Sequence, residues 1–123
     1  MSPFTSLLDT VRRHVDVSLA TWLGPKVVSA SHVSAEVGAA AEAVQGLALR
    51  GGKRMRAALV VAGFAAGDGM PLEALLRSTD RAMIAIELLQ VYLLVHDDWM
   101  DDDDVRRGGP AVHVLLRERL GSK

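Results

Sequence analysis

The sequence contains no cysteine, and only 4% of its 123 residues are aromatic. The missing cysteine excludes a disulfide scaffold, a thiolate metal site and a cysteine nucleophile. A net charge of −1 gives no overall attraction to nucleic acid or to anionic lipid. The longest apolar stretch, residues 82–95, is too short to cross a bilayer and is interrupted by Glu87 and Gln90. We therefore expect a cytoplasmic protein with no membrane span and no nucleic-acid partner.

Half of the residues are hydrophobic, mostly alanine, leucine and valine, and their spacing is helical. Apolar positions predict a first helix from Phe4 to Leu23, which Gly24-Pro25 should end because proline lacks the backbone N–H. Glycine and proline breaks separate further predicted helices over residues 35–49, 55–66, 72–101 and 112–120. The helix over 55–66 is apolar nearly all round, which predicts burial on every side. The stretch 72–101 is either one helix or two that meet near Ser78-Thr79. We expect an all-α fold.

The acidic side chains are concentrated in one segment, because six of the 15 lie between positions 97 and 104. Asp97 and Asp101 are four residues apart, so on a helix they lie within about 40° of each other and can reach the same ion. Bound cations relieve the repulsion between these carboxylates, and oxygen ligands favour Mg²⁺ before Mn²⁺ or Ca²⁺.

A solvated charge run at a helix end is the competing interpretation of this segment. Acidic residues are unfavourable at the C-terminal end of a helix, however, which is where this run lies. Arg106 and Arg107 follow it as paired donors suited to phosphate. The segment therefore predicts a metal–phosphate site.

A second candidate segment, RGGKRMR at residues 50–56, places two glycines before three cations and a predicted helix. Exposed backbone amides at the start of a helix, together with Lys and Arg side chains, form an anion-binding loop. The competing interpretation is a glycine helix cap followed by solvated basic residues. The spacing fits neither a Walker A loop nor a dinucleotide-binding fingerprint.

Taken together, these segments resemble the trans-isoprenyl diphosphate synthases, also called polyprenyl synthetases. GGKRMR at 51–56 matches the GGKRxR motif, DDWMD at 97–101 matches the first aspartate-rich motif DDxxD, and RRGGPAVH at 106–113 matches the RRGxPxxH that follows it. The resemblance covers about residues 49–113. It implies an isoprenoid-synthase-type helical bundle of which only the opening helices are present, so that residues 1–123 form the N-terminal part of a single polyprenyl synthetase domain.

The resemblance implies a Mg²⁺-dependent prenyltransferase, with Mn²⁺ as an alternative ion, that acts as a homodimer. Such an enzyme condenses an allylic diphosphate (dimethylallyl, geranyl or farnesyl diphosphate) with isopentenyl diphosphate. Tyr92 and Leu93, five and four residues before the first aspartate, occupy positions that help to set product length in the family. With a lone aromatic residue at the earlier position, the segment resembles a geranylgeranyl-type synthase more than a bacterial farnesyl-type one, and the expected product is C15–C20.

The same resemblance implies roles for individual residues. Asp97 and Asp101 would bind the Mg²⁺ ions with Asp98 in support, and Arg106 would contact the allylic diphosphate. The diphosphate of isopentenyl diphosphate would be held by four residues, Gly52, Lys53, Arg56 and Arg107. Gln90 stands where many members carry a histidine for this substrate, and its amide would donate a hydrogen bond instead.

Three interpretations of function stay open, because the sequence stops at Lys123 and contains no second aspartate-rich motif. The chain is a prenyltransferase or the N-terminal part of one. Alternatively, it is a truncated or non-catalytic helical fragment or subunit of such an enzyme. A class I terpene cyclase shares DDxxD but has no use for the GGKRxR loop. In each case we expect the isolated 123-residue chain to be inactive.

Overall fold

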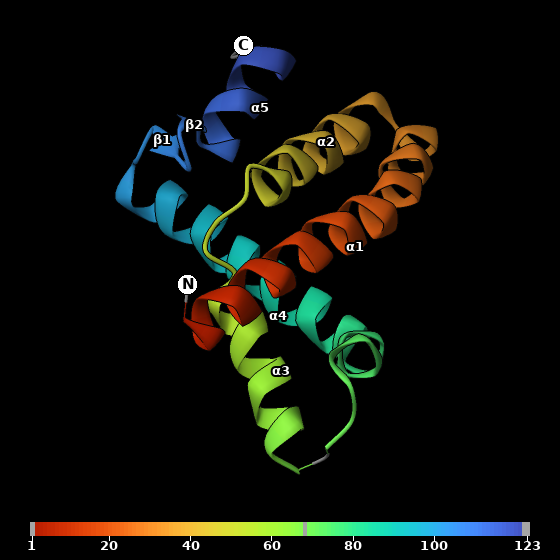
Figure 1. The fold of residues 1–123 in the computed structure, drawn as a ribbon. Coiled ribbons are helices and arrows are strands. Elements are labelled where there is room, and N and C mark those ends of the chain that lie inside the picture. The colour runs from red at the N-terminus through yellow and green to blue at the C-terminus, as the bar shows by residue number, and fades with distance from the viewer. Residues whose placement is uncertain (1, 68, 122–123) are drawn as a thin grey trace.

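A computed structural model describes residues 2–67 and 69–121, and helices make up most of it (Figure 1). In chain order the elements are α1 (Pro3–Val33), α2 (Ala35–Leu49), α3 (Met55–Gly67), α4 (Leu72–Asp101), β1 (Val105–Arg106), β2 (Gly109–Pro110) and α5 (Val112–Leu120). α2 returns antiparallel beside α1, and α3 and α4 form a second antiparallel pair. The predicted all-α fold class is confirmed. No helix in the described ranges is long and apolar enough to cross a membrane.

The core lies where α1, α2, α3 and α4 meet. One face of α1 is buried at intervals of four residues, which is the spacing of a single helix face. Aliphatic side chains from the other helices pack against it, so the core is formed by Val11, Val15, Leu19, Leu23, Leu47, Val61, Met83 and Val91. α5 packs on the end of α2 and on α4. The C-terminal half of α4 therefore extends from a rigid core towards the acidic segment.

The prediction that Gly24-Pro25 ends the first helix is wrong. α1 continues through Pro25 to Val33, and no joint appears at the glycine. Proline normally disfavours helix in the residue before it, because the proline ring clashes with the Cβ of that residue. Gly24 has no Cβ, so this clash is reduced, and the remaining costs are the hydrogen bond that the missing N–H would have made and the crowding of the proline ring against the carbonyl four residues earlier.

The end of α1 is instead set by Ser34. Its backbone N–H closes α1 on Ala30, and its Oγ accepts from the N–H of Val37 at the start of α2. Where the two helices part, a Cβ on Gly38 would lie 2.8 Å from Ser31 Oγ, so only glycine fits this close approach. Ser34 and Gly38 thus form the chain reversal between α1 and α2, which our sequence-based prediction placed ten residues too early.

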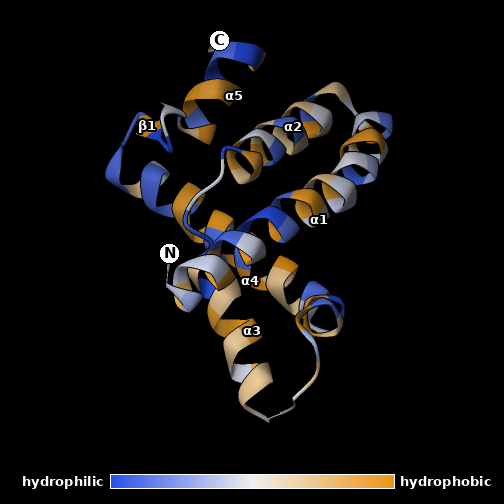
Figure 2. Cartoon of the chain, in the orientation of Figure 1, coloured by the Kyte–Doolittle hydropathy of each residue, from blue (hydrophilic) through white to orange (hydrophobic). Residues whose placement is uncertain are grey.

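α3 is apolar nearly all round, as expected (Figure 2), but it is not buried on all sides. Ala57, Ala58 and Val61 face the core, whereas Leu59 is 62% exposed and Phe64 is 42% exposed. The main contacts of this helix are with α1 and α4, and it lies at the edge of the structure. The prediction of complete burial is wrong for the described residues.

The remaining helix predictions agree with the structure. α2 and α5 have the predicted bounds, and α3 ends one residue later than predicted. α4 is a single helix with no joint at Ser78-Thr79, and the Thr79 hydroxyl donates back to the carbonyl of Leu75 within it. After α4 the chain forms a short antiparallel hairpin that pairs Val105 with Pro110.

Candidate active site

Asp97 and Asp101 lie on the last turns of α4 and are open to solvent, with the Asp97 side chain 65% exposed. α4 ends at Asp101, and Asp102 takes a left-handed conformation at φ 57° that closes the helix. A pair four residues apart on a helix has its Cβ atoms about 6 Å apart. Two exposed carboxylates at this spacing have the donor chemistry and the access that a hard divalent cation needs.

Asp103 lies outside α4, so its position cannot be predicted from helical geometry. Its backbone N–H donates to the carbonyl of Asp98 at 2.9 Å as the chain turns away. α4 ends at Asp101, so the helix does not place Asp103 on the face of Asp97, and we predict that Asp103 does not belong to the metal pair.

Asp98 differs from its acidic neighbours because it is completely buried. Arg106 binds it through two groups: Nε lies 3.1 Å from both carboxylate oxygens, and Nη2 lies 2.6 Å from Oδ1. Hydrogen bonding to Asp98 raises the pKa of Arg106, although desolvation acts in the opposite direction. Charge-assisted bonds of this kind are strong and fix the plane of the guanidinium. Asp98 therefore points inward and holds Arg106 beside the exposed carboxylates.

Arg106 keeps donors for a second partner, because its Nη1 makes no hydrogen bond within the described residues and its side chain is 32% exposed. The hairpin that carries it turns at Arg107 and Gly108, which both have positive φ, at 50° and 74°. Two consecutive residues with positive φ form the tight turn that matches the twist of a two-strand hairpin.

Arg107 reaches from this turn to the GGKRMR loop. Its Nη1 donates to the carbonyl of Leu47 at 3.1 Å, and a Cβ on Gly52 would lie 3.5 Å from its Nη2. Burial lowers the pKa of Arg107, and the nearby charge of Arg54 lowers it further. The structure thus brings together two of the predicted isopentenyl diphosphate residues, Gly52 and Arg107.

Lys53 and Arg56, the other two predicted cations of the loop, are exposed, whereas Arg54 between them is buried. Arg54 donates to Glu87 at 3.0 Å, to Asp16 at 3.1 Å and to the carbonyl of Ala48 at 2.7 Å. It therefore ties the loop to α1, α2 and α4 and leaves its two neighbours free to meet a ligand. Nothing in the sequence of the motif predicts this separate role of Arg54.

Gln90, Tyr92 and Leu93 lie further up α4. Gln90 is half-buried, whereas Tyr92 is 63% exposed and Leu93 is 45% exposed. The Tyr92 ring stacks at a tilt on His96, with centroids 6.3 Å apart. The described helices therefore leave both predicted chain-length residues uncovered, and their role stays a prediction.

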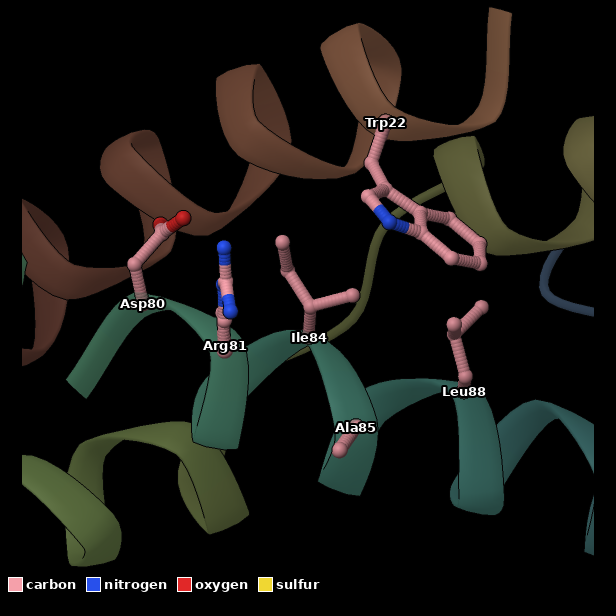
Figure 3. A pocket seen from close by; sticks show the side chains of 6 residues that line it. All are labelled: Trp22, Asp80, Arg81, Ile84, Ala85 and Leu88. Atoms are coloured by element: carbon pink, nitrogen blue, oxygen red, sulfur yellow. The ribbon is translucent and has the colours of Figure 1, made fainter. Parts of the chain in front are cut away.

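A cavity of about 500 Å³ lies on another face, between α1 and α4 (Figure 3). Trp22 of α1 leans over Ile84 and Leu88 of α4, and Asp80 and Arg81 lie at one end. The cavity contains none of the predicted site residues. Asp80 in this cavity links α4 to α1, since its Oδ1 accepts a hydrogen bond from the Ser18 hydroxyl and lies 2.8 Å from His14 Nε2.

A further group of side chains extends the acidic surface beyond α4. Asp102, Asp104 and His113 place one potential ligand atom each within 4.8 Å of one another. His113 belongs to the RRGxPxxH match, and its Nε2 lies 4.0 Å from Asp104 Oδ1. The amino-acid sequence alone does not place Asp102 and Asp104 beside His113, because only the folded hairpin brings residue 113 back beside residue 104.

Comparison with known proteins agrees with this arrangement of motifs. The model of the polyprenyl synthetase family matches residues 38–121, which include the loop, the end of α4 and the hairpin. The chain belongs to the polyprenyl synthetase family. This match covers about two thirds of the sequence and runs beyond the motifs into α2 and α5.

Diphosphate synthases are among the proteins similar to this chain. The geranylgeranyl diphosphate synthase of Methanosarcina mazei is 51% identical over 69 residues, which are 55% of this chain and 19% of that protein. The short chain isoprenyl diphosphate synthase of Methanothermobacter thermautotrophicus is 44% identical over 57% of this chain and 20% of its own length. The farnesyl diphosphate synthase of Haemophilus influenzae is 43% identical over 63% and 25%. The matched part is thus about a fifth to a quarter of each relative. No solved structure matches the chain significantly.

Proposed function

We propose that residues 1–123 form the N-terminal part of a single domain that catalyses Mg²⁺-dependent prenyl transfer. The enzyme would condense an allylic diphosphate with isopentenyl diphosphate to a C15–C20 product, as a cytoplasmic homodimer. The observation that carries this proposal is the end of α4, where the exposed pair Asp97 and Asp101 adjoins Arg106, held in place by the buried Asp98. Family membership and the named synthases among the relatives support it.

In this proposal Asp97 and Asp101 hold Mg²⁺, which supplies positive charge to stabilise a departing diphosphate. Arg106 donates its free N–H groups to the same allylic diphosphate. Such preorganised donors lower the barrier because they face charge that grows as the carbon–oxygen bond breaks. The double bond of isopentenyl diphosphate then attacks the allylic carbon, and loss of a proton completes the product.

The second diphosphate has a separate set of donors in this proposal. Lys53 and Arg56 are exposed on the loop, and Arg107 lies over Gly52. Gln90 would donate to the same substrate, and Tyr92 with Leu93, about one turn before Asp97 on α4, would set product length. Two separate anion sites are what distinguish a condensing synthase from a class I terpene cyclase, which ionises one diphosphate only.

Substitutions in the two sets of basic residues should affect the kinetics of different substrates. In a complete enzyme containing these residues, we expect Lys53→Ala or Arg56→Ala to raise the KM for isopentenyl diphosphate about tenfold or more, since a charge-assisted hydrogen bond contributes about 1.5–3 kcal/mol. Arg106→Ala should act mainly on the allylic substrate. Steady-state kinetics with each substrate varied in turn measures both, and Arg77→Ala, an exposed arginine on α4, is the control. Equal losses for both substrates in all three variants would contradict this assignment.

A non-catalytic helical fragment or subunit is the second candidate, and the chain spans about a fifth of the length of the relatives it matches. The two candidates agree on the isolated chain: we expect no measurable transfer by residues 1–123, because the donors that complete the allylic site lie outside them. A radiolabelled isopentenyl diphosphate assay on purified chain of confirmed mass tests this. A complete enzyme containing these residues should turn over, and an inactive one would favour the second candidate.

A further inference from the structure

Arg50 links the two segments that carry the predicted site, although it belongs to neither motif. It caps the C-terminus of α2, and its side chain crosses to the hairpin. Its Nη1 donates to the carbonyl of Arg106 in β1 at 2.9 Å and to the carbonyl of Pro110 in β2 at 2.7 Å. A single guanidinium nitrogen thus joins both strands of the hairpin to the helix that leads into the GGKRMR loop.

Gly109 makes room for this contact. A Cβ at position 109 would lie 2.8 Å from Arg50 Cζ, 3.0 Å from its Nη1 and 3.1 Å from its Nε. Gly109 is not among the residues with positive φ, so its backbone conformation suits alanine as well as glycine. The three atoms nearest to such a Cβ all belong to Arg50, so a larger residue at 109 has to displace the guanidinium.

The hairpin that Arg50 holds carries Arg106 and Arg107. Arg107 reaches α2 independently, through the carbonyl of Leu47, so the hairpin is attached to the end of α2 at two points. Among the described residues Arg50 donates to backbone carbonyls and to no carboxylate, and its positive charge adds a small part to the desolvation and the Arg54 charge that lower the pKa of Arg107. Like charges gathered in this way repel each other, and a bound polyanion would relieve that repulsion.

We propose that Arg50 is a positioning residue: its side chain fixes the hairpin 105–110 to the end of α2, a contact that we call the Arg50 pin. Gly109 leaves the space that the guanidinium occupies. The pin holds Arg106 and Arg107 where they meet a diphosphate. The link to diphosphate rests on the proposed function, whereas the pin itself does not.

The pin is tested first by amide hydrogen exchange on the 123-residue chain. The N–H of Ala111, which donates to Asp104 across the hairpin, reports on the hairpin, and the N–H of Asp103, which donates to Asp98, reports on the end of α4. We expect Arg50→Ala to speed exchange at Ala111 about tenfold or more, as for loss of hydrogen bonds from a charged group. Exchange at Asp103 should change much less, and Arg77→Ala should change neither.

Gly109→Ala provides a second, independent variant. It should reproduce the effect of Arg50→Ala, because the new methyl group displaces the guanidinium. In the double variant that combines Arg50→Ala with Gly109→Ala, the alanine at 109 should add little to the exchange rate at Ala111, since no guanidinium is left to displace. If Arg50→Ala leaves exchange at Ala111 unchanged, or if Gly109→Ala adds its full effect in the double variant, the pin is wrong.

The functional part is tested by calorimetry with inorganic pyrophosphate and Mg²⁺. Arg50→Ala and Gly109→Ala should each weaken binding about tenfold, and Arg50→Lys should restore only part of it, because its shorter side chain keeps the charge without the planar fork. Full restoration by Arg50→Lys with rapid exchange at Ala111 would mean that Arg50 acts by charge alone, which overturns the positioning role. If the unaltered chain binds no pyrophosphate, the proposed function fails in this chain, while the exchange experiment still decides the pin.

Discussion

Asp97→Asn and Asp101→Asn should each reduce turnover of a complete enzyme containing these residues by about 10²–10³-fold. Each change removes one negative charge from an exposed pair on the last turns of α4 and leaves the side-chain volume nearly unchanged. Weaker Mg²⁺ binding reduces stabilisation of the departing diphosphate. The expected fall in turnover corresponds to a loss of about 3–4 kcal/mol of transition-state stabilisation. Steady-state turnover at several Mg²⁺ concentrations measures it, and excess Mg²⁺ should restore part of the activity.

Asp103→Asn is the matched control, since it removes the same charge from the same acidic run. Asp103 lies beyond the end of α4 and contributes only its backbone N–H to the turn, together with a long-range attraction to Arg106. We expect turnover within about threefold of the unaltered enzyme, as for an exposed charge that does not touch the ligand. Mn²⁺ affinity of the 123-residue chain, measured by electron paramagnetic resonance, should follow the same order. A loss for Asp103→Asn as large as that for Asp97→Asn would mean that the acidic run binds metal in another geometry.

The helices could be predicted from the sequence because their causes are local. Apolar spacing together with glycine and proline breaks gave the bounds of α2, α4 and α5. The end of α1 was missed because Gly24 weakens the proline clash, which is a pairwise effect that single-residue propensities do not contain. The burial of α3 was overestimated because amphipathicity describes one helix, whereas burial depends on how many neighbours cover it.

The motifs could also be found in the sequence, but the division of labour within them could not. Asp98 looks like its five acidic neighbours, yet it is buried while Asp97 and Asp101 are exposed. The sequence did contain one indication that Asp98 is buried. Asp98 lies at a helical spacing from Ile84, Glu87 and Val91, which belong to the buried face of α4. The partner of Asp98 could not be inferred, because Arg106 reaches it only through the turn that ends the helix.

Arg54 shows the same limit over a longer distance. Its neighbours in the motif, Lys53 and Arg56, are exposed, and nothing in the charge pattern distinguishes it from them. Its partners Asp16 and Glu87 lie 38 and 33 positions away in the sequence. Only packing of α1 and α4 around the loop brings these charges together, so the assignment required the three-dimensional structure.

That buried pair leads to the largest expected effect on stability. Glu87→Leu should lower the free energy of unfolding by about 3–5 kcal/mol, because it leaves the guanidinium of Arg54 buried with only the partly exposed Asp16 as a counter-charge. Glu87→Gln keeps an acceptor and should cost less, about 1–3 kcal/mol. Urea unfolding followed by circular dichroism measures both on the 123-residue chain. Arg56→Ala, in the same motif but exposed, should stay within about 0.5 kcal/mol.

The double variant Arg54→Met with Glu87→Leu separates the energy of the pair from the cost of breaking it. Removing both charges avoids an uncompensated buried ion, so the double variant should be more stable than Glu87→Leu alone. It should remain less stable than the unaltered chain, because the carbonyl of Ala48 loses its donor. Faster exchange of the amides in residues 51–56 should accompany the loss, since Arg54 is what fastens the loop to α1, α2 and α4. If the destabilisation by the two substitutions is additive, Arg54 and Glu87 do not act as a pair, and the loop is held by other contacts.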